Sequence, residues 1–219
     1  MAGRAGEKRE LERRREILRR LADAYPGSAR QLCELEFADP FQLLVATILS
    51  AQCTDERVNM VTRDLFSRYP SADALAAADP EEVERIVYPT GFFRAKAANV
   101  LKVSAAVAER GGEVPSTMEE LVRLPGVGRK TANVVISVAF GEPGLPVDTH
   151  VSRLSKRLGL TQSGDPVKIE AELMSWVPPA ESGGLSLRLI LHGRRVCKAK
   201  KPDCASCVLA DLCPSAIAP

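Results

Sequence analysis

Apolar side chains recur at helical spacing along most of the chain, and signals for helix starts recur with them. The pairs Asp39-Pro40, Asp79-Pro80 and Asp165-Pro166 each place an N-capping aspartate before a proline, which suits the first helical position. This punctuation predicts an all-α protein. The expected helices cover approximately residues 8–24, 40–51, 55–69, 80–87, 94–110, 117–123, 129–140, 149–158, 166–176 and 185–193.

Further signals mark where helices begin and end. Ser116 and Glu119 have capping-box spacing, which predicts a helix start there. Glycines predict helix ends at Gly111-Gly112, Gly141 and Gly159. The segment EPGLP, beginning at residue 142, interrupts the helical patterns and is the best candidate for a crossing between two lobes.

The first predicted helix is highly charged, with eight basic and four acidic residues among positions 1–20. Glu10 and Arg14, and Glu16 and Arg20, stand at the i,i+4 spacing of ion pairs. Its apolar residues form one narrow stripe: Leu11, Ile17, Leu18 and Leu21. We interpret the charged face as solvated, with phosphate contact by its arginines as the alternative.

Composition is that of an ordinary globular protein, with 219 residues, 45% hydrophobic and 26% charged. The net charge is only +2, so overall charge predicts no partner. The chain has neither a signal-peptide pattern at its start nor a run of 18 apolar residues, so we expect a soluble, cytoplasmic protein without a membrane partner. In a reducing compartment its six cysteines are not expected to form disulfides.

Four of these cysteines crowd the end of the chain in the pattern C-x6-C-x2-C-x5-C, at Cys197, Cys204, Cys207 and Cys213. Four thiolates at such spacing predict a site for zinc or an iron-sulfur cluster. Only one pair has the x2 spacing that zinc ribbons use twice, which weakly favours a cluster and leaves the metal open.

The loop between the first two of these cysteines is strongly basic. It carries Lys198, Lys200 and Lys201, and Arg194 and Arg195 stand just before it. Such a density of positive charge favours contact with nucleic acid.

A tight hairpin joins the predicted helices 117–123 and 129–140 through Leu124–Gly128. Gly126 and Gly128 can adopt positive φ and let backbone N–H groups approach an anion at the start of the second helix. The neighbouring Arg123, Arg129 and Lys130 make phosphate the expected anion, held without reading the base sequence. The alternative is an ordinary helix-helix turn.

Lys130 is the candidate nucleophile. In the first turn of a helix a lysine lies at the positive end of the helix dipole, which disfavours its charged form, and burial would disfavour that form further. A free amine can attack a carbon centre.

Asp148 precedes the apolar helical pattern of Val151, Leu154 and Leu158, so it is expected to be an N-cap. A fixed carboxylate there would also stabilise positive charge developing on a sugar ring, and the two roles are compatible. His150 and His192 have no second histidine at ligand spacing, so we expect them to be structural.

Together, the segments LPGVGRKTA, VDTH and LHGR and the cysteine pattern resemble endonuclease III, a family of helix-hairpin-helix DNA glycosylases, over residues 30–213. The resemblance implies a two-lobed fold: a six-helix barrel domain at 33–142 with the hairpin, and an iron-sulfur cluster domain formed by 1–32 plus 143–219. It also implies a [4Fe-4S] cluster on the four cysteines and duplex DNA lying across the cleft between the lobes. The expected protein is a monomer that reaches the bacterial nucleoid through DNA binding.

The same resemblance implies a bifunctional DNA glycosylase and AP lyase that excises oxidised pyrimidines from damaged duplex DNA and also acts on abasic sites. Lys130 would be the nucleophile and Asp148 its carboxylate partner. Gln52 would enter the hole left by the flipped base, and a second wedge would come from Phe92, with Phe93 as the alternative. The implied DNA-binding residues are Gln52, Phe92, Gly126, Gly128, Arg129, Lys198, Lys200 and Lys201.

The chain departs from the commoner family pattern at Phe92, where many relatives have an aliphatic residue, and at Ser186-Leu187-Arg188. Two alternatives stay open: a related glycosylase for mismatched or deaminated bases, against which Lys130 argues, and a non-catalytic iron-sulfur protein that binds DNA. Both phenylalanines could instead belong to the core.

Overall fold

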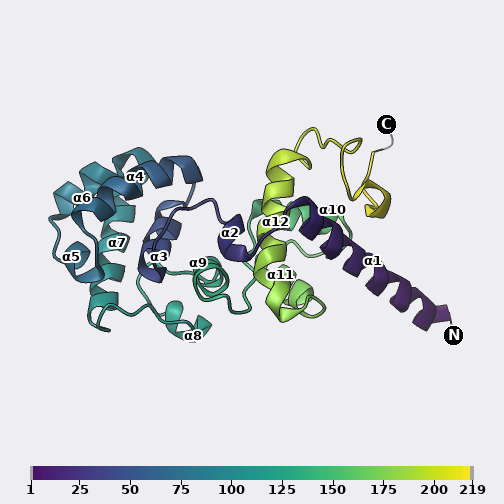
Figure 1. The fold of residues 1–219 in the computed structure, drawn as a ribbon, viewed down its shortest axis with the longest axis horizontal. Helices are drawn as coiled ribbons and strands as arrows, with labels where there is room; N and C mark the ends of the chain where they lie inside the picture. Colours follow the sequence, from purple (N-terminus) through teal and green to yellow (C-terminus); the bar gives the residue numbers. More distant parts are fainter. Residues whose placement is uncertain (1, 218–219) are drawn as a thin grey trace. The chain divides into compact units, whose positions relative to one another are not determined.

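The computed structural model describes residues 2–217, with side chains from residue 6 onward, and divides the chain into two units (Figure 1). One unit is formed by residues 33–142, the other by the residues up to 32 and from 143 onward. Regular structure among residues 2–217 is helical only, which confirms the all-α prediction. None of the described helices is both long enough and apolar enough to cross a bilayer.

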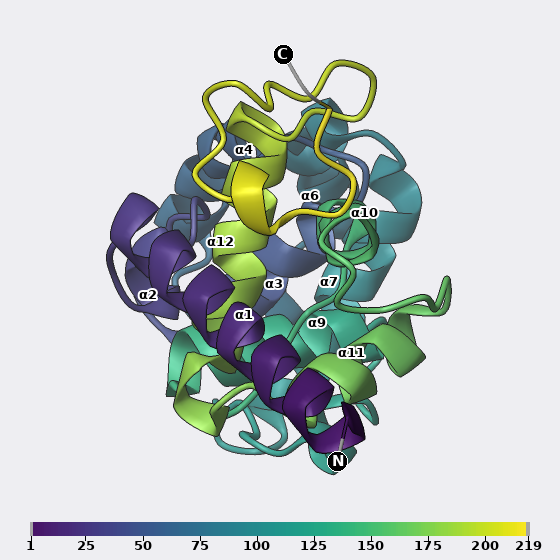
Figure 2. The same ribbon diagram turned by 90° about the vertical axis from the view of Figure 1, so that its right-hand side faces the viewer.

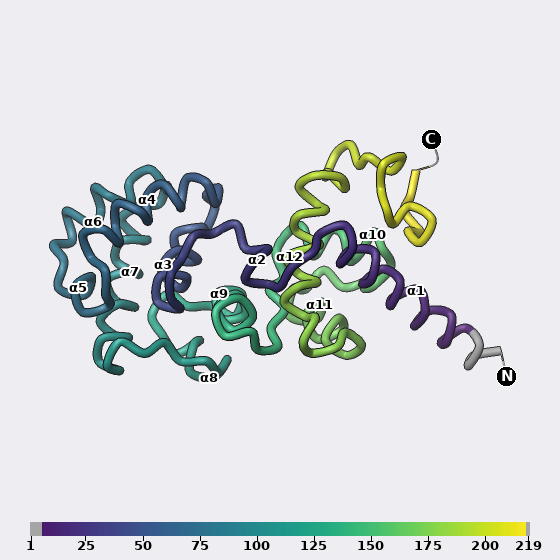
Figure 3. The backbone as a smooth tube through the Cα atoms, in the orientation of Figure 1, coloured from purple at the N-terminus to yellow at the C-terminus, as the bar shows by residue number. Residues whose placement is uncertain are grey.

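The unit of residues 33–142 is organised around α7 (Phe93–Ala108), which packs against α3, α5 and α6 (Figure 3). Val100, Val103 and Val107 of α7 are fully buried in its core. The other elements of this unit are α3 (Pro40–Leu49), α4 (Asp55–Arg68), α5 (Ala72–Ala76), α6 (Pro80–Val87), the 3-10 turn η1 (Tyr88–Thr90), α8 (Met118–Leu121), α9 (Arg129–Val134) and the π-helix η2 (Val135–Phe140).

In the other unit α12 (Ser182–Arg195) packs against α1 (Ala2–Ala24) and α10 (Thr149–Arg157), and Figure 2 shows α1 running across α12. Ile17 and Leu21 of α1 join Leu185 and Leu189 of α12 in one buried cluster, whereas Leu11 at the edge of the predicted stripe is 38% exposed. The remaining elements are α2 (Ala29–Leu32), α11 (Pro166–Met174) and the 3-10 turns η3 (Pro179–Glu181) and η4 (Ala210–Leu212).

All three predicted Asp-Pro helix starts are confirmed. Asp39, Asp79 and Asp165 each accept a hydrogen bond from a backbone N–H in the first turn, at 2.9, 3.1 and 2.8 Å. The predicted capping box at Ser116 is wrong by one position, because Thr117 caps α8 and pairs with Glu120. The later start places Leu121 in the core, fully buried.

The ion pairs predicted along α1 are present, but its arginines do more than face solvent. Arg13 donates to the carbonyls of Leu158 and Leu212 at 2.8 and 2.9 Å, and Arg20 donates to Val208 and Asp211. Guanidinium groups with several donors are well suited to hold carbonyls in this way. The first helix therefore holds residues 196–217, the C-terminal segment, in place. Its charge pattern alone did not predict this structural role.

Candidate active site and nucleic-acid interface

The hairpin between α8 and α9 needs glycine at one position for two reasons. Gly126 has a backbone φ of 74°, which residues other than glycine rarely adopt. An added Cβ would also lie 2.9 Å from Cγ of Asn99 on α7. Gly128 differs from expectation: its φ is −92°, an ordinary extended value, and nothing lies within 4 Å of an added Cβ. Gly128 is the N-cap residue of α9 and leaves the surface open there.

Arg129 and Lys130 begin α9, and both are exposed. The first turn of this helix carries no acidic residue, and the helical rod continues through η2 to Phe140. The burial that the sequence analysis considered for Lys130 is absent. The side chain is accessible to a large substrate such as DNA.

Asp148 is the N-cap of α10, as its position predicted. Its Oδ1 accepts a hydrogen bond from the Val151 N–H at 2.8 Å, and the side chain is half-buried. The carboxylate is thus fixed in direction by the helix that it caps. One oxygen is occupied by the cap, which leaves the other for a second role.

Gln52 and Phe92, the two predicted wedge residues, share an unusual backbone conformation. They are the only non-glycine residues with positive φ among residues 2–217, at 54° and 48°. Bulky residues in this region are strained, and such strain gathers at functional sites. Both residues line one cavity of about 230 Å³, together with Lys96, Asn99 and Gly126.

Phe92 and Phe93 have different surroundings. Phe92 is 69% exposed, so it is not a core residue. The Phe93 ring packs on Tyr88 with centroids 4.9 Å apart, and the Arg94 guanidinium lies 5.3 Å from its centre. Phe92 therefore has the freer side chain, whereas Phe93 is held by its neighbours.

Lys96 is a residue that the sequence analysis did not single out. It is 4% exposed, and its Nζ donates to the carbonyl of Thr90 at 2.7 Å. Burial lowers the pKa of Lys96. A signal was present, because Lys96 stands one helical turn before the buried Val100 on the apolar stripe of α7.

The four C-terminal cysteines, all half-buried, line one small cavity of about 30 Å³. Among residues 2–217 no three His, Cys, Asp or Glu side chains stand together as ligands of a single ion. Four thiols around one enclosed, mostly apolar cavity are nevertheless the donor set that an iron-sulfur cluster requires. Burial raises the pKa of Cys207 and Cys213, and the other thiols of the set raise it further.

Nitrogen atoms of Arg157 and His192 lie within hydrogen-bond distance of two of these sulfur atoms. Arg157 approaches Sγ of Cys197 at 3.2 Å, and Nε2 of His192 lies 3.3 Å from Sγ of Cys207. The opposite nitrogen of His192 meets the Tyr25 hydroxyl at 3.1 Å. His192 is 2% exposed, and burial lowers its pKa, which favours the neutral ring. The expected structural role of His192 is confirmed by these contacts.

Close packing explains the glycine of the LHGR segment. A Cβ on Gly193 would lie 2.8 Å from Nδ1 of His150, so α10 and α12 approach as closely as they do only with glycine here. Arg153 reaches across the same contact to the carbonyls of Gly193 and Cys197 at 3.1 and 3.0 Å. His150 thus packs at a helix-helix contact, as expected of a structural histidine.

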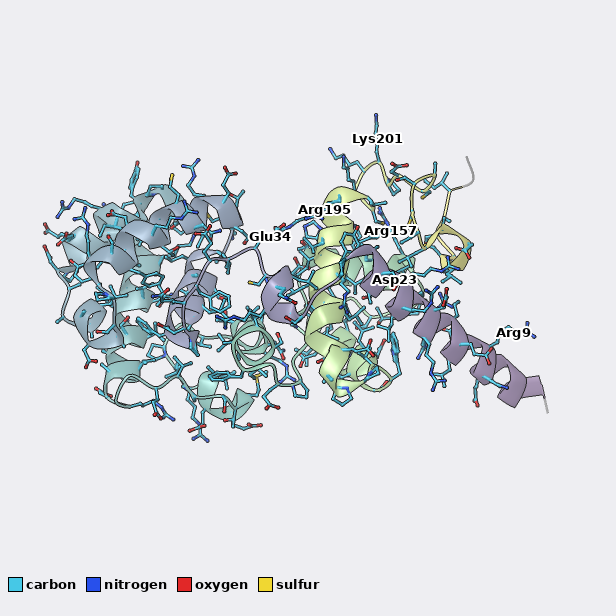
Figure 4. The ribbon with its side chains drawn as sticks, in the orientation of Figure 1. Arg9, Asp23, Glu34, Arg157, Arg195 and Lys201 are labelled. Carbon is cyan, nitrogen blue, oxygen red and sulfur yellow. The ribbon has the colours of Figure 1, made fainter. Side chains whose placement is uncertain are left out.

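The basic loop is fastened at its base and exposed along its lysines. Arg157 donates to the carbonyls of Lys198 and Ala199 at 2.8 and 2.7 Å. Lys198, Lys200 and Lys201 are exposed, and Figure 4 shows the Lys201 side chain extending away from the ribbon. Arg157 was not predicted, because a basic residue in the last turn of a helix is common and carries no specific signal.

Comparisons with known proteins agree with this arrangement. Residues 45–179 match the model of the HhH-GPD superfamily base excision DNA repair proteins, and residues 197–213 match the iron-sulfur binding domain of endonuclease III. A protein named endonuclease III from Synechocystis sp. is 55% identical over 94% of this chain and 93% of its own length.

Solved structures are also similar. A non-covalent endonuclease III-DNA complex superposes with a TM-score of 0.87 at 44% identity, over 94% of this chain and 96% of that one. A trapped endonuclease III-DNA covalent intermediate has the same identity, coverage and TM-score.

Proposed function

This chain belongs to the HhH-GPD superfamily of base excision DNA repair proteins, and from that premise we propose that it is a bifunctional DNA glycosylase and AP lyase of the endonuclease III type. Its substrate is duplex DNA that contains oxidised pyrimidines or abasic sites. The observation that carries the proposal is an exposed lysine, Lys130, in the first turn of the helix that follows the glycine hairpin.

The proposed chemistry begins with the damaged nucleotide flipped out of the stack. The Lys130 amine attacks C1′ of its deoxyribose, the C1′–N bond breaks, and the base departs with the bonding electrons and takes up a proton. The C1′–O4′ bond then breaks, O4′ takes up the proton that Nζ gives up, and a Schiff base remains between C1′ and Nζ. Loss of a C2′ proton then expels the 3′ phosphate by β-elimination, which nicks the strand.

Asp148 is proposed to act as the fixed carboxylate that stabilises positive charge on the sugar as the base leaves. Its direction is set by the hydrogen bond to the Val151 N–H. A carboxylate that is already oriented requires no reorganisation during the reaction, which is what electrostatic catalysis needs.

DNA contact is proposed at three places. The amides around Gly126 and Gly128, with Arg129, hold a phosphate. Gln52 and Phe92 fill the hole in the stack, and their strained backbones support a functional role. Lys198, Lys200 and Lys201 add phosphate contacts, and DNA binding of this kind would keep the protein on the nucleoid.

Cys197, Cys204, Cys207 and Cys213 are proposed to hold a [4Fe-4S] cluster, supported by the cavity that they share and by the match of residues 197–213. The bound cluster would supply a rigid cross-link and one-electron redox chemistry. Substitution of one cysteine should remove the broad visible absorption of iron-thiolate clusters and the bound iron. Colourless protein that contains zinc would contradict the proposal.

Reduction by borohydride tests the nucleophile. Added during turnover on a duplex with an oxidised pyrimidine, it should trap a covalent protein-DNA adduct with the parent protein and with the control Lys102→Ala, whose lysine is exposed on α7. Lys130→Ala should give no adduct. If Lys130→Ala traps as well as the parent, the Schiff-base mechanism is wrong.

A further inference from the structure

One buried residue of α7, Lys96, forms hydrogen bonds to the turn that carries Phe92. The Nζ of Lys96 donates to the carbonyl of Thr90 at 2.7 Å, and the backbone N–H of the same residue donates to the carbonyl of Phe92 at 3.1 Å. These two hydrogen bonds lie on either side of Gly91. We refer to them together as the Lys96 clamp.

The turn needs such support because its conformation is unfavourable. Phe92 has φ of 48° and stands at the N-cap position of α7 without a side-chain cap. Its side chain is 69% exposed, so no core packing holds it in place. A bulky residue in the left-handed region persists only when its surroundings over-determine it.

Burial of a lysine for this purpose is unusual. Lys96 is 4% exposed, and its Nζ is paired with a backbone carbonyl rather than with a carboxylate. Buried ammonium groups are normally paired with a charge, so a neutral aliphatic residue would fit this position on the apolar stripe more favourably. We therefore attribute the lysine at this position to the hydrogen bond that its Nζ donates, and not to any gain in the stability of the core.

Lys96 also borders the other structures proposed to contact DNA. It lines the same cavity of about 230 Å³ as Gln52, whose φ is 54°. Asn99, which follows Lys96 by three residues on α7, packs against Gly126 of the hairpin. Lys96 and Asn99 of α7 thus line one cavity together with Gln52, Phe92 and Gly126 of the hairpin.

We propose that Lys96 is a positioning residue for base flipping, which holds the Phe92 turn ready to enter the hole left by a flipped nucleotide. The inference rests on the proposed function, because it needs Phe92 to act as a wedge. A wedge that is held in place before binding loses less conformational freedom on insertion than one that must be ordered first.

The test uses the full protein and two duplexes, one with a tetrahydrofuran abasic analogue and one undamaged. Their Kd ratio measures discrimination. Lys96→Met keeps an unbranched side chain that is one atom shorter and removes the donor, and we expect it to lower discrimination about tenfold while binding of undamaged duplex is unchanged. The control Lys102→Met removes an exposed lysine from the same helix and should leave both affinities unchanged.

A double-mutant cycle separates positioning from general structural damage. Because Lys96 acts through Phe92, Lys96→Met should cause no further loss of discrimination in a Phe92→Ala background. The fluorescence of 2-aminopurine placed opposite the analogue should fall both in Lys96→Met and in Phe92→Ala, since the base is then less well separated from its neighbours. Thermal unfolding of each variant checks that the fold is kept; if Lys96→Met does not fold, Lys96→Leu, which also lacks a donor, takes its place in the same cycle.

Discrimination that survives Lys96→Met, or losses that add in the double variant, would overturn the clamp. If Phe92→Ala loses discrimination and Lys96→Met does not, only the role of Lys96 is wrong. If Phe92→Ala itself discriminates normally, the wedge role of Phe92 in the proposed function fails, and the role of Lys96 fails with it.

Discussion

Asp148 offers a substitution that separates stability from catalysis. The N-cap hydrogen bond uses only Oδ1, at 2.8 Å from the Val151 N–H. Asparagine retains an oxygen that can accept this bond and caps helices about as well as aspartate. Asp148→Asn therefore removes the negative charge and leaves the cap in place, whereas Asp148→Ala removes both.

The expected magnitudes differ enough to be measured. Loss of the cap in Asp148→Ala should cost about 1 kcal/mol of unfolding free energy, which lowers the Tm of a chain of this size by roughly 2–4 °C. Asp148→Asn should leave the Tm within about 1 °C of the parent. Loss of a fixed charge that acts in the transition state should lower kcat on the order of 100-fold in both variants.

Three measurements on one set of proteins decide the matter: thermal unfolding, single-turnover excision from an oxidised-pyrimidine duplex, and the Kd for a duplex with an abasic analogue. Turnover should fall much more than affinity, because the charge matters chiefly in the transition state. An Asp148→Asn variant that keeps normal turnover would refute the catalytic role. Losses of turnover and affinity in Asp148→Ala that Asp148→Asn does not share would leave Asp148 as a cap alone.

Three further substitutions test other parts of the structure. Gly193→Ala should lower the Tm by several degrees, because its Cβ would lie 2.8 Å from an imidazole nitrogen of α10, and an unchanged Tm would mean that the helices separate easily. Removal of Lys200 and Lys201 together should reduce the slope of log K against log salt for DNA binding by about 2, and an unchanged slope would show that neither contacts phosphate. Replacement of His192 by Phe should make the cluster potential more negative, because the ring donor 3.3 Å from Sγ of Cys207 is lost, and an unshifted potential in electrochemistry would contradict that hydrogen bond.

Helix positions were predictable from the sequence where local chemistry decides them. Asp39, Asp79 and Asp165 each cap a helix as expected, because an N-cap depends only on the residues of its own first turn. The short helices α2 and α5 were missed, because four or five residues are too few to show a 3.6-residue period. The start of α12 was placed three residues late, because Gly183 and Gly184 are poor helix formers whose burial depends on tertiary packing.

Candidate functional residues fall into two groups in the same way. Lys130, Asp148 and the four cysteines are proposed from residue type, from spacing along the chain and from the resemblance to endonuclease III, so the sequence alone nominates them. The strained backbones of Gln52 and Phe92 and the burial of Lys96 depend on which segments meet in the fold. No local pattern encodes a positive φ at a non-glycine residue, so the shared cavity of these three residues becomes visible only in the structure.

Positive charge in this chain serves two different purposes, which the sequence alone does not separate. Arg13, Arg20 and Arg157 each donate to a backbone carbonyl of the C-terminal segment, which between residues 196 and 217 has one short 3-10 turn as its regular structure. That segment would otherwise leave its carbonyls dependent on solvent, and arginine can satisfy several of them at once. Lys200 and Lys201, in contrast, are exposed point charges on a loop whose base is already fastened. Around the C-terminal segment the division follows the chemistry of the side chains: these arginines hold the backbone, and the exposed lysines are the ones proposed to meet phosphate.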